Sequence, residues 1–140
     1  MQTWNQRLYL IKNLCIQGLS KEFVNIVFNA IVLGRLTYVI QAWDGYLLEY
    51  EIDRVDKLIC KAHRWGLATI KYNYGDLLNE QDVKLFRACQ QRGHCLSHHL
   101  TLKPKFTMSL RPSGHPFVIP RLTYQITRNS FFNRCLYNFK

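Results

Sequence analysis

Residues 48–66 read LEYEIDRVDKLICKAHRWG, and this stretch establishes the helical character of the chain. Its apolar side chains recur at intervals of three and four, which is the spacing of one face of an α-helix. That face consists of Ile52, Val55, Ile59 and Ala62. The sequence therefore predicts a helix that packs on a core through this face and that ends at Gly66.

The opposite face of the same stretch is positively charged. Four basic residues follow one another at intervals of three, four and three: Arg54, Lys57, Lys61 and Arg64. At 1.5 Å per residue this row is about 15 Å long. Such a row can follow the phosphates of a nucleic acid, or it can be an ordinary solvated helix face with Asp53 and Asp56 nearby. Both interpretations stay open, and neither excludes the other.

Two helices are expected before this one. Apolar residues follow helical spacing from residue 8 to residue 15, and Gly18 provides a stop. The long apolar segment 23–43 predicts a second helix, capped by Ser20 and buried on most of its circumference. This segment contains Arg35, and a central arginine costs about 2.5–3.5 kcal/mol on membrane-insertion scales. We therefore interpret it as a core helix and not as a membrane span.

A fourth helix and an irregular tail are expected after residue 78. Asn79 can cap a helix that runs toward Leu100, with Glu80 and Asp82 in the first turn, where the helix dipole favours acidic side chains. All four prolines then fall within a short segment and prevent a regular helix there: Pro104, Pro112, Pro116 and Pro120.

Apolar and polar residues alternate near the end of the chain, which is a pattern typical of β-strands. Segments 117–119 and 121–128 predict one or two short strands, and 130–139 predicts a final short helix. The expected fold is thus mainly α: a bundle of about four helices over residues 1–100, followed by a basic, proline-containing tail over residues 101–140 with a short β element.

The charge of the chain is concentrated in its second half. There are 19 lysines and arginines against 9 aspartates and glutamates, which gives a formal charge of +10. All acidic residues lie between Glu22 and Asp82, so the segment 83–140 contains basic residues and no acidic ones. Such an excess favours phosphate polymers or an anionic membrane as partners. Because the apolar segment is expected in the core, we predict nucleic acid and no membrane.

The cysteines indicate a reducing compartment. The chain has five, which is an odd number, and they lack the spacing of a disulfide framework. The sequence also does not start with the pattern of a signal peptide. We expect a nuclear or cytoplasmic location and no secretion.

A cluster of cysteines and histidines raises the possibility of a zinc site. It consists of Cys89, His94, Cys95, His98 and His99. Structural zinc sites usually draw two ligand pairs from separate segments, whereas these residues fall on one expected helix with no second pair downstream. We therefore expect no metal and no cofactor.

Cys95 and His98 come nearest to a catalytic pair, because they would share one face of a helix. No carboxylate in the segment 83–140 can orient the histidine. The sequence also lacks a glycine-rich phosphate loop and the clustered carboxylates that two-metal phosphoryl transfer requires. We expect no catalytic residues, and a Cys/His-dependent enzyme is the third of our hypotheses.

Aromatic residues are interleaved with basic ones in the tail. The segment 103–140 places seven rings among seven lysines and arginines: Phe106, Phe117, Tyr124, Phe131, Phe132, Tyr137 and Phe139. Cations attract the phosphate backbone, and rings can stack on bases. Alternatively the rings anchor the tail to the helices, and we expect that role for Phe131, Phe132 and Phe139.

Seven stretches follow one another in a characteristic order and spacing. They are QRLYLIKNL (6–14), LTYVIQAWDG (36–45), DRVDKLICKAHRWG (53–66), HCLSHH (94–99), LRPSGH (110–115), IPR (119–121) and TRNSF (127–131). Together they resemble the segment that follows the catalytic palm in reverse transcriptases of non-LTR (LINE-like) retrotransposons. His115 stands where that family commonly has an arginine.

In that family the segment is the helical thumb and C-terminal connector, which grips template and primer through their backbones. The resemblance implies a non-catalytic fragment that binds RNA or an RNA–DNA duplex, with an upstream polymerase palm domain as a missing partner. The palm's Tyr/Phe-x-Asp-Asp turn is absent, so polymerase activity is not implied. The opening Gln6-Arg-Leu-Tyr9 also resembles the N-terminal domain of an alkylation-repair homologue, but without an iron motif no dioxygenase chemistry follows.

The residues expected to contact phosphate are Arg54, Lys57, Lys61, Arg64, Arg111, Arg121 and Arg128. If six to eight cations do so, the logarithm of the binding constant falls with the logarithm of salt concentration at a slope of about −5 to −7. The alternative is a structural or protein-interaction bundle, or an inert relic of a retroelement. Its signature would be an exposed apolar face on the helix over residues 23–43.

Overall fold

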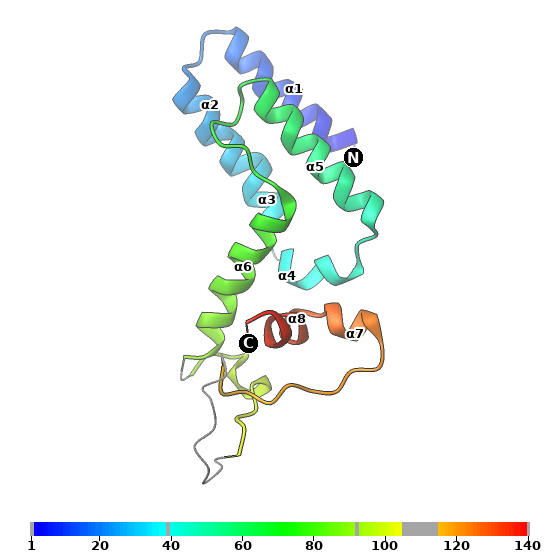
Figure 1. Ribbon diagram of the computed structural model, residues 1–140. Coiled ribbons are helices and arrows are strands. Elements are labelled where there is room, and N and C mark those ends of the chain that lie inside the picture. Colours follow the sequence, from blue (N-terminus) through cyan, green and yellow to red (C-terminus); the bar gives the residue numbers. More distant parts are fainter. Residues whose placement is uncertain (1, 39, 92, 105–114, 140) are drawn as a thin grey trace. The chain divides into compact units, whose positions relative to one another are not determined.

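The computed structural model describes residues 2–38, 40–91, 93–104 and 115–139 (Figure 1). The chain is mainly helical, as the sequence predicts. Its α-helices are α1 (Gln2–Ile16), α2 (Lys21–Phe28), α3 (Gly34–Thr37), α4 (Ile40–Trp43), α5 (Glu49–Arg64), α6 (Tyr74–Cys89), α7 (Gln125–Asn129) and α8 (Phe131–Asn138). A π-helical turn, Asn29–Leu33, joins α2 to α3, and Asp44–Tyr46 and Ser97–His99 form 3-10 turns.

The chain forms two compact units. Unit 1 comprises Met1–Ile40 and Leu47–Leu78, and unit 2 comprises Gln41–Tyr46 and Asn79–Lys140. The sequence predicts a division at residue 100 because its composition changes there, whereas the two units are defined by contacts between residues.

Unit 1 is built from α1, α2, α3 and α5. Figure 1 shows α1 beside both α2 and α5, in agreement with the residue contacts between these helices. The core contains Leu8, Ile11, Val24, Phe28, Val32, Leu36, Leu58, Ile59 and Ala62. The predicted helix over 48–66 is confirmed as α5, although Ile52 and Val55 of its apolar face are only half-buried. Gly18, with φ +98°, ends α1 in the left-handed conformation that glycine adopts without strain.

The second helix differs from the prediction in continuity and in burial. After α2 the helix changes to a π-helical turn at Asn29 and continues as α3. Helix α3 then ends before Tyr38, whose backbone is extended (φ −61°, ψ 112°). Ser20 occupies the N-cap position but makes no side-chain cap hydrogen bond. Phe23 and Ile26 are 59% and 60% exposed, because the neighbouring helices cover one side of the helix only. The prediction of burial around most of the circumference was therefore wrong.

The helical stretch Lys21–Tyr46 is long and apolar enough to cross a membrane, with a mean hydropathy of 1.7. Length and composition alone meet this criterion, and core helices of soluble proteins meet it as well. Of the 18-residue window that meets the criterion, 35% is buried inside the fold, and the stretch passes through residue 39, which lies outside the described residues.

Helix α6 begins earlier and ends earlier than predicted. The side-chain oxygen of Asn73 accepts a hydrogen bond from the backbone N–H of Asp76 at 2.9 Å, so Asn73 and not Asn79 caps the helix. The backbone N–H of Tyr74 donates to the carboxylate of Asp56 at 2.7 Å. The helix ends at Cys89 instead of approaching Leu100.

Unit 2 has a small core of its own, to which α6 and the end of the chain contribute. Its buried residues are Phe86, Phe117, Cys135 and Leu136, with Leu100, Phe131 and Phe139 packed against them. The predicted anchoring of Phe131 and Phe139 is thereby confirmed. Phe132 is half-buried, and its ring centroid lies 5.1 Å from that of His99.

His115 is buried within unit 2 and satisfies both ring nitrogens. Its Nε2 donates to the backbone oxygen of Leu136 at 2.8 Å, and its Nδ1 accepts from the backbone N–H of Phe117 at 3.2 Å. A backbone N–H can only donate and a carbonyl can only accept, so the neutral ring carries its proton on Nε2. His115 is thus a structural residue of this unit.

The β content of the tail is smaller than predicted. Leu102 and Phe117 form an isolated antiparallel bridge, which is the expected short β element. The prediction of a strand over residues 121–128 was wrong, because Gln125–Asn129 is the helix α7. The final helix was predicted correctly, since α8 covers Phe131–Asn138.

Candidate nucleic-acid interface

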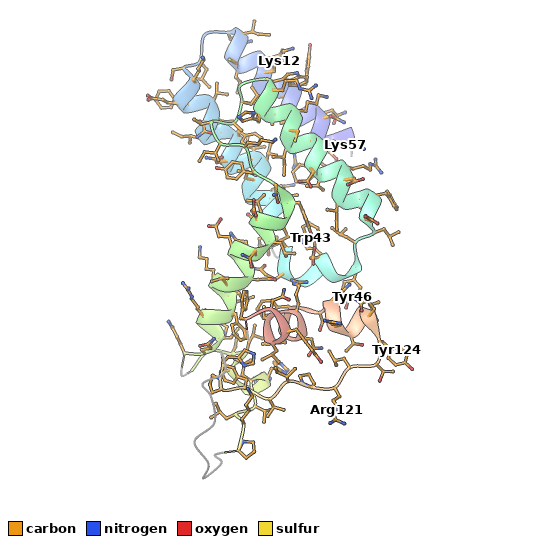
Figure 2. All side chains as sticks on the ribbon, viewed as in Figure 1. Lys12, Trp43, Tyr46, Lys57, Arg121 and Tyr124 are labelled. Atoms are coloured by element: carbon orange, nitrogen blue, oxygen red, sulfur yellow. The ribbon has the colours of Figure 1, made fainter. Side chains whose placement is uncertain are left out.

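The row of cations predicted on residues 54–64 lies on α5, in unit 1. Arg54, Lys57 and Arg64 are exposed, and Lys61 is half-buried. Figure 2 shows Lys57 on α5 and Lys12 on the neighbouring α1. We call the four cations of α5 the basic stripe: Arg54, Lys57, Lys61 and Arg64.

The carboxylates near the basic stripe do not neutralise it by ion pairing. Among the residues that the structure describes, none of the four cations of the stripe forms an ion pair within 4 Å. Asp56 instead accepts the backbone N–H of Tyr74, and Asp53 is exposed to solvent. The three exposed cations of the stripe therefore present their charge to solvent.

Helix α1 turns the basic stripe into one wall of a groove. Lys61 donates from Nζ to the side-chain oxygen of Asn5 at 3.2 Å, which joins α5 to α1. A hollow of about 220 Å³ follows this junction and is lined by Asn5, Arg54, Lys57, Leu58 and Lys61. The groove is thus lined by three of the four stripe cations together with Asn5 and one apolar residue, Leu58.

Trp65, directly after α5, holds two lysines. The Nζ atoms of Lys12 and Lys61 lie 4.7 and 4.6 Å from its ring centroid, which is the range of cation–π contacts. Two ammonium groups from different helices are thereby held around one indole. The prediction from sequence did not include Lys12 or Asn5, because nothing local in the sequence of α1 indicates that these residues face α5.

Of the three cations predicted in the tail, the two that the structure describes belong to a different unit from the basic stripe. Arg121 and Arg128 belong to unit 2 and are exposed. The guanidinium of Arg128 lies 5.0 Å from the ring centroid of Tyr137, and Figure 2 shows Arg121 on the segment before α7. Arg111 lies outside the described residues.

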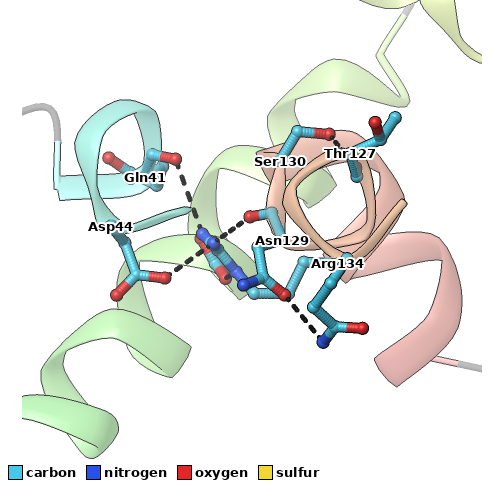
Figure 3. A network of polar contacts seen from close by, with 8 residues as sticks. Gln41, Asp44, Thr127, Asn129, Ser130 and Arg134 are labelled. Atoms are coloured by element: carbon cyan, nitrogen blue, oxygen red, sulfur yellow. Dashed lines mark hydrogen bonds and ion pairs between the residues drawn. The ribbon is translucent and has the colours of Figure 1, made fainter. Parts of the chain in front are cut away.

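Arg134 is a tail cation with a structural role. Figure 3 shows its guanidinium surrounded by acceptors of unit 2. Nε and Nη2 donate to the two oxygens of Asp82 at 2.7 and 3.0 Å, and Nη1 donates to Asp44 at 2.8 Å. Nη1 also donates to the backbone oxygen of Asn129 at 2.7 Å, and Nη2 to that of Gln41 at 3.5 Å. All five guanidinium donors are therefore used within the fold.

Asp82 differs from its predicted place in the first turn of a helix. It lies in the middle of α6, and its side chain is only 5% exposed. Burial raises the pKa of Asp82, and the hydrogen bonds and charge of Arg134 oppose this shift. The carboxylate thus depends on Arg134 to remain ionised inside the fold.

The cysteines and histidines do not gather around a common point in the described parts of the chain. No group of three or more His, Cys, Asp or Glu residues there could hold a metal ion. The ring centroids of His98 and His99 lie 3.9 Å apart. No hydrogen bond joins Cys95 to a histidine ring among the residues that the structure describes.

Burial suppresses the reactivity of two thiols. It raises the pKa of Cys89 above its ordinary value and that of Cys135 to about 12, with the charge of Asp82 adding to the second shift. A thiol with such a pKa stays protonated at neutral pH and is a poor nucleophile.

We therefore expect iodoacetamide at about pH 8 to alkylate Cys135 at least about a thousandfold more slowly than an ordinary cysteine, since the thiolate fraction falls tenfold per pKa unit. The exposed Cys95 serves as the internal reference in a mass-spectrometric time course on the native chain. Equal rates at the two positions would show that Cys135 is not held as a buried thiol.

The free energy of unfolding should decline as the pH rises from 9.0 toward about 12, because in that window the thiol of Cys135 ionises in the unfolded chain but not in the folded one.

No protein-family model, curated protein or solved structure matches this chain.

Proposed function

We propose that the chain is a non-catalytic module that binds nucleic acid through backbone phosphates, with the basic stripe of α5 as its principal contact surface. The observation that carries this proposal is the row of four cations on one helix face, three exposed and one half-buried, that form no ion pair among the described residues. Cations held in a row supply sequence-independent affinity for phosphate, because their binding releases condensed counterions.

The arrangement around the stripe supports the same function. Asn5 and Trp65 hold Lys61 in place. Part of the conformational entropy of the Lys61 side chain is therefore lost on folding and is not lost again on binding. Arginines stand at the two ends of the stripe and lysines between them, which provides both planar and point-like donors for phosphate oxygens. The resemblance to the thumb and connector of LINE-like reverse transcriptases favours RNA or an RNA–DNA duplex as the polymer.

The test is the salt dependence of binding by the full chain. A fluorescein-labelled oligonucleotide of about 12 nucleotides is titrated by anisotropy between about 0.05 and 0.2 M NaCl. Four phosphate contacts predict a slope of the logarithm of the binding constant against the logarithm of salt of about −3 for single strands and about −4 for duplexes. Contacts from Arg111, Arg121 and Arg128 would steepen it toward −5 to −7. A flat response would contradict the proposal.

A protein-interaction bundle is the second candidate, and one observation favours it. Several large apolar side chains of α1, α2 and the π-helical turn are exposed: Tyr9, Leu10, Leu14, Ile16, Phe23, Ile26 and Ile31. This is the apolar exposure expected of such a bundle. None of these residues belongs to the basic stripe, so the salt titration tests the first function without excluding the second.

A further inference from the structure

A second hollow continues the groove at the end of the basic stripe. It measures about 610 Å³ and is lined by Asn5, Gln6, Tyr9, Leu10, Lys61 and Trp65. Asn5 and Lys61 also line the groove along the stripe, so the two hollows share a wall. A chain of phosphates that follows the stripe would therefore reach this hollow at Lys61.

The lining of the second hollow differs in chemistry from the stripe. Tyr9, Leu10 and Trp65 provide aromatic and aliphatic surface, while Asn5 and Gln6 provide carboxamides, each with donors and an acceptor. Its volume lies within the roughly 300–1,000 Å³ of pockets that hold small organic ligands. Apolar walls with a few polar groups and one ammonium at the edge match a flat heterocycle attached to a phosphate.

We propose that this hollow receives one unpaired base of a single-stranded nucleic acid whose phosphates lie along the basic stripe; the inference rests on the proposed function. In a duplex the bases are stacked and paired, so their faces cannot enter a pocket. In a single strand each base has a free face that stacks on an aromatic ring irrespective of sequence. The hollow thus gives single strands a contact that duplexes lack.

Tyr9 is the ring that stacks on the base. Its side chain is 58% exposed, whereas the indole of Trp65 is engaged by the ammonium groups of Lys12 and Lys61. Trp65 acts as a positioning residue that holds Lys61 at the mouth of the hollow. Asn5, bonded through its oxygen to Lys61, is placed to meet the edge of the base with its amide nitrogen.

The experiment compares single strands with the matching duplex, using the full chain and the Tyr9→Ala variant. The probes are labelled oligouridine and oligothymidine of about 12 nucleotides and a duplex of the same length. We expect Tyr9→Ala to weaken binding of the single strands about 5- to 100-fold, the loss of one base stack, with duplex affinity and salt slope unchanged. Tyr46→Ala, an exposed tyrosine outside α5 that does not line the hollow, is the matched control and should change neither affinity.

Photo-crosslinking provides the second readout. An oligonucleotide that carries 5-iodouracil in place of uracil should attach to a peptide that contains Tyr9 or Trp65 when irradiated in the complex. Binding of either RNA or DNA with this dependence on Tyr9 supports the inference, and the tighter of the two identifies the polymer. If single strands and duplex bind equally well, with the same salt dependence, and Tyr9→Ala changes neither affinity, the base pocket is overturned while the phosphate contacts remain supported. Absence of salt-dependent binding to every probe would overturn both.

Discussion

Replacing Arg134 with methionine is expected to lower the free energy of unfolding by about 3–5 kcal/mol. The guanidinium is the partner of two carboxylates in unit 2, and the side chains of Arg134 and Asp82 are only 12% and 5% exposed. Methionine fills much of the same space but leaves the Asp82 charge without a counterion. It also leaves the backbone oxygens of Asn129 and Gln41 without this donor.

Urea denaturation followed by circular dichroism measures this effect. Arg128→Met is the matched control, because Arg128 is an exposed arginine of the neighbouring α7, and loss of its cation–π contact with Tyr137 should change stability by no more than about 1 kcal/mol. Arg134→Met combined with Asp82→Leu should recover part of the loss, since the uncompensated charge is then removed. An Arg134→Met variant as stable as the Arg128→Met control would show that the network does not hold unit 2 together.

Reversing the charge of the exposed cations of the basic stripe is expected to weaken nucleic-acid binding about 100-fold or more at about 0.1 M salt. The variant is Arg54→Glu/Lys57→Glu/Arg64→Glu. Each lost phosphate contact removes about 0.7 from the salt slope, which corresponds to a factor of about five in affinity at this salt concentration, and the new carboxylates repel phosphate in addition. Lys61 is left unchanged because it donates a hydrogen bond to Asn5 and makes a cation–π contact with Trp65.

The control for this variant carries the same change in net charge elsewhere in unit 1. Lys21→Glu/Arg35→Glu/Lys71→Glu alters three cations that are likewise exposed and lie off α5. If affinity depends on the position of the cations, the control loses far less than the stripe variant. Equal losses would mean that net charge alone governs binding and that the stripe is not an interface.

The sequence predicts α5 well because its pattern is local and consistent. Core residues such as Ile59 recur at helical spacing, acidic residues start the helix and basic residues end it. The start of α6 was placed wrongly although a signal exists. Asn73 precedes Asp76 by three residues, which is the spacing of a side-chain cap, but the cap was predicted at Asn79.

The contacts that complete the site and stabilise unit 2 could not be predicted, since they join residues far apart in the sequence. Arg134 and Asp82 are 52 positions apart, and Lys61 and Asn5 are 56 apart. Before folding, Arg134 counts as one more positive charge of an acid-free tail. Only the fold shows that its donors are used internally and that Lys12, Asn5 and Tyr9 of α1 face the stripe or its groove.

Nucleic-acid binding is proposed to depend on phosphate contacts made by the stripe itself, and a comparison of salt slopes tests these contacts most directly. The wild-type chain and the uncharged variant Arg54→Gln/Lys57→Gln/Arg64→Gln are titrated in parallel with the same single strand. The slope changes by about 0.7 for each phosphate contact that the variant loses. We predict that the variant's slope is shallower by about 2; identical slopes for the two proteins would contradict the proposed interface.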